Sequence, residues 1–176
     1  MDALTGSLSA QHAPGRPLAS RQTAIVGAGL AIVVAMQIVL LFQKGINWDE
    51  FFHLTEVYRF RDGTLTHPLQ TFWVRLLEWV PATGGTSVDQ IILVRCFMLV
   101  AALVTAGGIF AVARRFAEPA AALLCALAYL TAGYVFTQTF AYRADPLAAA
   151  CLVWVLWIAG AERLSWAKVA IGADLV

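Results

Sequence analysis

Two short polar segments carry the residues whose types could do chemistry in this otherwise apolar chain. Asp49 and Glu50 stand side by side in the segment GINWDEFFH, directly after a long apolar run. Arg143 and Asp145 stand in the segment YRADP, between two other apolar runs. A carboxylate held near a lipid boundary is partly desolvated, which raises its basicity and lets it take a proton from an acceptor hydroxyl or amine. These segments are the candidates for a reaction centre.

Both segments also have ordinary structural roles open to them. Asp49 can cap a helix that follows it, with Glu50 solvated. Asp145 precedes Pro146 and can be the N-cap of an apolar helix, while Arg143 lies near the carbonyl end of the helix before it. Spacing alone does not separate these roles from chemistry, so both interpretations stay open.

Arg95 is a further candidate because it lies inside an apolar run. A charge at the middle of a membrane helix costs about 2.5–3.5 kcal/mol, and less near the end of the helix. We therefore expect Arg95 to have a partner, either a phosphate at the membrane interface or one of the carboxylates.

His53 and His67 have no His-x-x-x-His or His/Asp spacing, so the sequence predicts no metal site.

The composition is that of a membrane protein. Of the 176 residues, 60% are hydrophobic and 13% are charged, whereas a soluble domain has about a quarter charged residues. The net charge is +1 and the basic residues are scattered, which excludes nucleic acid as a partner and leaves the lipid bilayer as the expected surroundings. The Ala-rich composition fits a bacterium with a GC-rich genome.

Four apolar runs are each predicted to form a membrane span. Residues 23–42 carry no charge, and at 1.5 Å per residue a helix of that length crosses a hydrocarbon core of about 30 Å. Residues 1–22 are rich in Ala, Ser, Pro and Gly and predict a disordered tail. The other spans are predicted at 91–113, 119–138 and 146–161, and residues 166–176 are expected to start a further, truncated span.

Two amphipathic helices are predicted between the first two spans, at 48–60 and 68–80. Their aromatic residues are suited to the level of the lipid headgroups. The predicted fold is therefore an all-α integral membrane protein whose membrane domain covers residues 23–165. The first helix rests on the helical spacing of Trp48, Phe51, Phe52, Thr55 and Tyr58, and the second on that of Leu69, Phe72, Trp73, Leu76, Leu77 and Val80 after Pro68.

The basic residues that flank the spans predict the orientation of the chain, because short basic flanks face the cytoplasm. With four crossings, the flanking residues fall on one side, which places the N-terminus in the cytoplasm. The 43–90 loop and the 138–145 turn then lie together on the extracytoplasmic face of the plasma (inner) membrane. The flanking residues are Arg16, Arg21, Arg114, Arg115, Arg163 and Lys168.

The order of these features resembles one family. An acid pair follows the first span, two surface helices come next, an Arg heads the second span and Arg-Arg ends it, and YRADPLAAACLVWVLW opens the fourth. This order resembles the polytopic C-type glycosyltransferases of the protein O-mannosyltransferase and lipid A aminoarabinose transferase group, families 39 and 83. The resemblance covers about residues 23–165. Members of that group are longer, so the chain is expected to be an N-terminal part, one part of a split enzyme or a remnant.

The resemblance implies transfer of a sugar from a polyprenyl-phosphate donor to a glycan, lipid or protein acceptor outside the cytoplasm. It implies that Asp49 acts as the base or positions the acceptor, with Glu50 completing the acid pair. It also implies that Arg143 and Asp145 lie near the donor phosphate, where a guanidinium can hold two oxygens, with Arg95 as a further candidate. No cofactor is certain, and a divalent cation is left open. The alternatives are a non-catalytic membrane protein, such as a transporter subunit or assembly factor, and an inactive remnant.

Overall fold

The structure, a computed structural model, describes residues 16–66 and 71–160, and in this part of the chain all regular structure is helical. The all-α prediction is confirmed for these residues. The predicted tail before residue 16, His67 and the truncated span at 166–176 lie outside the described residues. The helices are α1 (Arg16–Gln43), α2 (Trp48–Arg61), α3 (Thr71–Leu76), the 3₁₀ helix η1 (Val80–Thr83), α4 (Ser87–Ala113), α5 (Pro119–Thr131), α6 (Gly133–Gln138) and α7 (Asp145–Ala159).

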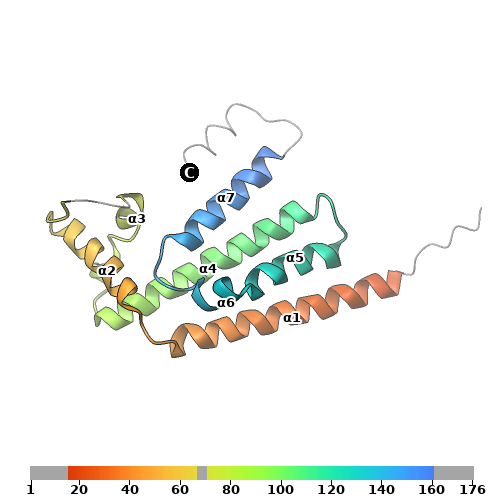
Figure 1. Ribbon diagram of the computed structural model, residues 1–176, viewed down its shortest axis with the longest axis horizontal. Helices are drawn as coiled ribbons and strands as arrows, with labels where there is room; N and C mark the ends of the chain where they lie inside the picture. Colours follow the sequence, from red (N-terminus) through yellow and green to blue (C-terminus); the bar gives the residue numbers. More distant parts are fainter. Residues whose placement is uncertain (1–15, 67–70, 161–176) are drawn as a thin grey trace, which may run out of the picture.

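Helix α4 lies at the centre of the arrangement. It packs against α7 and α5, and α5 packs in turn against α1. Successive long helices run in alternating directions, and the short helices α2 and α3 lie at the end of the bundle where α1 ends and α4 begins (Figure 1). The end of α1, the start of α2, the start of α4 and the start of α7 are therefore brought to one end of the molecule.

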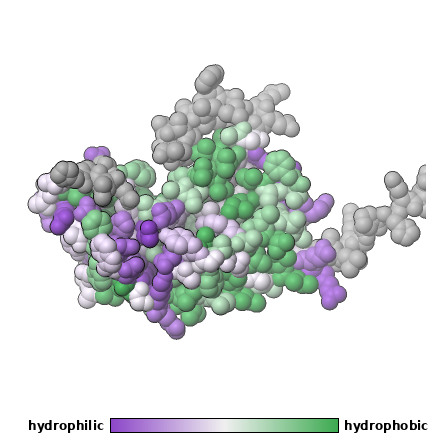
Figure 2. Space-filling model, viewed as in Figure 1, coloured by the Kyte–Doolittle hydropathy of each residue, from purple (hydrophilic) through white to green (hydrophobic). Residues whose placement is uncertain are grey.

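Two helices are long and apolar enough to span a membrane. They comprise Ser20–Gln43 of α1 and Ser87–Ala113 of α4, and the shorter of them is about 36 Å long at 1.5 Å per residue, against a hydrocarbon core of about 30 Å. Large apolar side chains on α1 are exposed, among them Ile25, Ile32 and Val39. Figure 2 shows hydrophobic surface over the long helices and hydrophilic surface gathered over the end that carries α2.

Both long helices begin earlier than the sequence predicts. Helix α1 starts at Arg16, so the part of the predicted tail from residue 16 to residue 22 is helical. Pro17 suits this first turn because the N–H that it lacks has no helical partner there. Helix α4 starts at Ser87 because Thr86 and Asp89 form a capping box, in which the Asp89 carboxylate accepts from the Thr86 N–H at 2.8 Å.

The third predicted span, 119–138, is two helices rather than one. The chain is extended at Ala132, where ψ is 129°, and this separates α5 from α6. Carbonyls in the last turn of a helix lack intrahelical partners, and here the Leu130 carbonyl accepts from Nε2 of the fully buried Gln37 at 3.2 Å. The fourth predicted span, 146–161, corresponds to α7, which ends at Ala159 and at 15 residues is about 22 Å long.

The second predicted surface helix, 68–80, is also shorter than expected. The helical part described is the six-residue α3, followed by turns and by η1, which contains Pro81. Four of its apolar side chains, Trp73, Val74, Leu77 and Val80, are buried in a core shared with α2 and α4, whereas Phe72 and Trp79 are exposed. This core contains Leu54, Val57, Trp73, Val74, Leu77, Val80, Ile91, Val94, Met98 and Tyr142.

The first predicted surface helix, 48–60, agrees with α2 to within one residue. Its aromatic residues Trp48, Phe51, Phe52 and Tyr58 are exposed, while its opposite face, with Leu54 and Val57, is buried. An exposed aromatic face of this kind suits the headgroup level of a membrane.

Candidate active site

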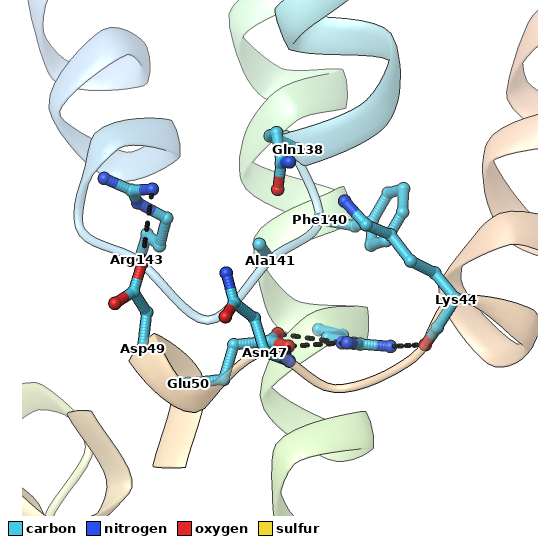
Figure 3. Close-up of a pocket in the computed structure, with 9 residues that line it drawn as sticks. Lys44, Asn47, Asp49, Glu50, Gln138, Phe140, Ala141 and Arg143 are labelled. Atoms are coloured by element: carbon cyan, nitrogen blue, oxygen red, sulfur yellow. Dashed lines mark hydrogen bonds and ion pairs between the residues drawn. The ribbon is translucent and has the colours of Figure 1, made fainter. Parts of the chain in front are cut away.

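The two polar segments meet at the end of the bundle. Arg143 Nη1 lies 3.9 Å from Asp49 Oδ2 (Figure 3). Arg143 Nε lies 3.1 Å from Asp145 Oδ2. The Arg143 and Asp49 side chains are 37% and 36% exposed, and Asp145 is 64% exposed. The two segments therefore lie together in the structure, as expected, and the membrane face to which they belong stays a prediction. Their charges are opposite and within reach of a molecule outside the protein.

Asp49 and Asp145 each lie at the start of a helix. Neither is the N-cap of its helix, so the predicted capping role is wrong for both. The N-cap of α2 is Asn47, whose backbone N–H donates to Glu50 Oε2 at 3.1 Å. Asp49 thus lies within the first turn, where a carboxylate is favoured by the helix dipole. Asp145 is the first residue of α7, after the N-cap Ala144.

Glu50 is buried and is not solvated. Glu50 and Arg95 are each 2% exposed and form a two-pronged ion pair: Arg95 Nε donates to Glu50 Oε1 at 2.8 Å, and Nη2 donates to Oε2 at 2.5 Å. The expectation that Arg95 has a partner is confirmed, and of the two partners expected, a phosphate or a carboxylate, the structure shows the carboxylate. Oε1 also accepts from the Tyr142 N–H at 3.0 Å, one residue before Arg143. Glu50 therefore joins the start of α2 to the loop that carries Arg143.

Arg95 also binds backbone carbonyls at and after the end of α1, and so joins α1 to the start of α2. Its Nη1 donates to the carbonyls of Leu41 at 3.0 Å and Lys44 at 2.9 Å, and its Nη2 donates to that of Gly45 at 3.2 Å. With the two bonds to Glu50, the five N–H donors of the guanidinium are occupied. The geometry thus favours positioning roles for Glu50 and Arg95. It does not favour the predicted catalytic role for Glu50 or substrate-binding role for Arg95.

The hydrogen bonds to Glu50 keep it charged. Burial by itself raises the pKa of a carboxyl group, because it disfavours the charged form. The bonds that Glu50 accepts from Arg95, Tyr142 and Asn47, with the positive charge of Arg95, outweigh burial and lower the pKa of Glu50 below its ordinary value. The ion pair is therefore formed at neutral pH.

His53 lies one helical turn after Asp49 and belongs to an aromatic cluster beside the charged residues. Its ring stacks on Tyr142 with centroids 6.1 Å apart, and it meets Trp73 and Phe52 edge to face. Burial, and then the charge of Arg143, lower the pKa of His53, although the nearby carboxylates oppose this. A neutral imidazole is therefore favoured. The prediction that His53 lacks a His/Asp spacing overlooked Asp49, and the i, i+4 spacing of these two residues is the signal that could have placed His53 here.

A small hollow opens between Arg143 and Lys44, which was not among the predicted site residues. Asn47 and Gln138 extend toward each other across the hollow, with Ala141 beside them (Figure 3). Lys44 Nζ donates to the Thr137 carbonyl at 2.6 Å and lies 5.6 Å from the centre of the Phe140 ring. The sequence signal for Lys44 is its place directly after the first span.

Within residues 16–66 and 71–160, no group of three or more His, Cys, Asp or Glu side chains is arranged to hold a metal ion. No protein-family model, no curated protein and no solved structure matches this chain. The described residues and their geometry are therefore the basis for a functional assignment.

Proposed function

We propose that this chain is a membrane glycosyltransferase, or part of one, that transfers a sugar from a polyprenyl-phosphate donor to an extracytoplasmic glycan, lipid or protein. The observation that carries the proposal is the contact between Asp49 and Arg143. Asp49 lies in the first turn of α2 and Arg143 lies in the connection between α6 and α7; their side-chain atoms Oδ2 and Nη1 are 3.9 Å apart, and both side chains are more than a third exposed. The order of polar and apolar segments in the sequence, which resembles C-type glycosyltransferases, supports the same reaction.

Each residue of the cluster has a distinct role in this reaction. Arg143 binds oxygens of the donor phosphate and stabilises the negative charge that develops as the lipid phosphate leaves. Asp145 orients Arg143 through its Nε atom. Asp49 takes the proton from the acceptor hydroxyl while the acceptor oxygen forms a bond to the anomeric carbon. The bond from that carbon to the phosphate oxygen breaks, the electron pair leaves with the lipid phosphate, and the configuration inverts.

The proposal includes a membrane topology. Helices α1 and α4 are two spans, α5 with α6 forms a third and α7 a fourth, and the N-terminus lies in the cytoplasm of a bacterial cell. The cluster then lies at the extracytoplasmic surface of the plasma membrane. The exposed aromatic residues of α2, Trp48, Phe51 and Phe52, lie at the level of the headgroups beside it.

The test is sugar transfer by the purified chain in proteoliposomes, with radiolabelled polyprenyl-phosphate sugars as donors. A general base contributes about 10²- to 10⁴-fold to a rate, so Asp49→Asn should slow transfer by that factor. The matched control is Asp62→Asn, because Asp62 is an exposed carboxylate at the other end of α2. Equal rates for wild type and Asp49→Asn, or no transfer by the wild type from any donor, would contradict the proposal.

A further inference from the structure

Lys44 is a cation without a carboxylate partner among the described residues. Arg95 is neutralised by Glu50, and Arg143 is shared by Asp49 and Asp145. Lys44 donates instead to a neutral carbonyl, that of Thr137. The side chain is half-buried and lines the same hollow as Arg143, with the amides of Asn47 and Gln138 between the two cations. Asp49 and Glu50 also line the hollow, so its three cations, Lys44, Arg95 and Arg143, exceed its carboxylates by one charge. This excess is complementary to an anionic group seated between Lys44 and Arg143.

An apolar groove runs along α1 beside α6. Its volume is about 430 Å³. Three of its lining side chains on α1 are at least half exposed, and all of its lining residues are apolar. The groove is lined by Ile32, Ala35, Met36, Val39, Leu40 and Phe136.

The groove leads to Lys44. Leu40 is one helical turn before Lys44, and the Lys44 N–H donates to the Leu40 carbonyl at 2.8 Å. On the other wall, Phe136 is adjacent to Thr137, whose carbonyl binds Lys44 Nζ. The groove therefore lies along the apolar segment Ser20–Gln43, and the cation stands directly after this segment ends.

We propose that the groove between α1 and α6 binds the hydrocarbon chain of a lipid that carries a phosphate headgroup, and that Lys44 holds this headgroup opposite Arg143. An apolar groove on a membrane span faces lipid chains, and a lysine at the end of that span stands at headgroup depth. The inference rests on the proposed function and adds to it a second phosphate-binding residue and the path of the donor's lipid chain.

The test measures binding, so it does not depend on sugar transfer. Native mass spectrometry of the purified chain in detergent would give dissociation constants for a polyprenyl monophosphate, for the uncharged polyprenol and for inorganic phosphate. A hydrogen bond to a charged group contributes about tenfold or more in affinity. Wild type should therefore bind the monophosphate at least about tenfold more tightly than the polyprenol. Lys44→Met should remove most of this difference, and Lys44→Arg should retain it.

A second pair of variants tests the groove. Ala35→Trp fills it from an exposed position of α1 and should weaken binding of the polyprenyl monophosphate about tenfold or more. Val100→Trp introduces the same side chain at an exposed position of α4 outside the groove and should leave binding unchanged.

Three results would overturn the inference: equal affinity of wild type for the monophosphate and the polyprenol, unchanged binding by Ala35→Trp, or competition by inorganic phosphate as strong as that of the lipid. The last result would mean a site for free phosphate. Lipid binding that behaves as expected without any sugar transfer would contradict only the proposed function. Asp49-dependent transfer with normal lipid binding by Lys44→Met and Ala35→Trp would contradict only this inference.

Discussion

Asp49 and Glu50 are neighbours in the sequence, yet they have opposite surroundings. Successive residues of an α-helix point about 100° apart, so Glu50 faces α4 and is 2% exposed while Asp49 faces outward and is 36% exposed. The buried acid binds Arg95 and the Tyr142 N–H, and the exposed acid lies beside Arg143. One acid thus positions the segments that carry the other acid and the arginine.

The sequence predicts that Arg95 has a partner, either a phosphate or a carboxylate, and which carboxylate can reach it depends on where α2 begins. A cap at Asp49, the structural alternative, would place Glu50 at the first helical position. The N-cap is instead Asn47, which places Glu50 at the third helical position and turns it toward α4. The spacing Asn-x-x-Glu is the capping-box signal for this start. A shift of two residues in the position of the N-cap therefore decides which of the two acids is buried.

Loss of the buried ion pair should unfold the protein more readily. Removing one partner of a buried pair leaves an uncompensated charge and costs about 3–5 kcal/mol. Glu50→Ala should therefore lower the free energy of unfolding by about that amount, measured by denaturant titration in detergent. Glu78→Ala is the matched control, because Glu78 is exposed, and should change the free energy little. Similar values for the two variants would mean that Glu50 does not hold the site together.

A low pH should weaken the ion pair between Glu50 and Arg95. The pKa of Glu50 is lower in the folded protein than its ordinary value of 4.5, so the unfolded chain takes up the proton first as the pH falls. The stabilisation is complete above about pH 4.5 and decreases below it, through the lowered pKa. Thermal unfolding midpoints of wild type and Glu50→Gln should therefore converge below pH 4.5. A constant difference down to pH 3 would contradict this assignment.

At the scale of the helices, α7 reaches α4 through a close contact at Gly108. A Cβ atom added there would lie 2.6 Å from Val153 Cγ1, and the neighbouring Trp154 Nε1 donates to the Val104 carbonyl at 3.2 Å. Small residues let membrane helices approach closely. Because α7 begins at Asp145, two residues after Arg143, this packing fixes the direction in which the charged segment leaves the bundle.

Gly108→Ala should destabilise this packing. Overpacking a tight site costs about 1–3 kcal/mol, and the β-branched Val153 has few alternative rotamers. Gly107→Ala is the matched control: the helix-propensity gain is the same, and a Cβ there meets nothing within 4 Å. Thermal unfolding in detergent should give a lower midpoint for Gly108→Ala than for Gly107→Ala. The opposite order would mean that α4 and α7 are not held as closely as the structure indicates.

The helices agree best with the sequence-based prediction where an apolar run is long and a capping motif precedes it. The capping box at Thr86 and Asp89 and the run after it give α4, and the spacing of aromatic residues gives α2. The break at Ala132 has no proline to signal it, and the Leu130 carbonyl beside it is bound by a residue distant in the sequence, Gln37. The apolar pattern at 68–80 predicts one helix, but its described residues, 71–80, pack against two other helices and form the short α3 and the start of η1.

At the scale of the whole molecule, an apolar bundle carries a polar end in which residues from distant parts of the chain meet. The sequence predicts this meeting only from the expected membrane topology. Two predicted spans separate the two polar segments, and two crossings return the chain to the same side of the membrane. It does not predict the separation of Asp49 and Arg143, which depends on the buried contacts of Glu50 and Arg95.

The proposed topology places the two ends of the bundle on opposite sides of the membrane. In a background without the native cysteines, Asp62→Cys should react with an impermeant maleimide added to intact cells, because it lies at the end that carries the cluster. Glu118→Cys, in the exposed connection between α4 and α5, should react only after the cells are permeabilised. Labelling of both positions from the same side would contradict the topology.

The most direct test of the reaction centre is a double-mutant cycle on the rate of sugar transfer. Residues that act as one unit have non-additive effects. Asp49→Asn and Arg143→Gln should each slow transfer from the polyprenyl-phosphate donor, and the double variant should be about as slow as the slower single variant. A double variant whose loss equals the product of the two single losses, or an Arg143→Gln variant with the wild-type rate, would show that these residues do not form one reaction centre.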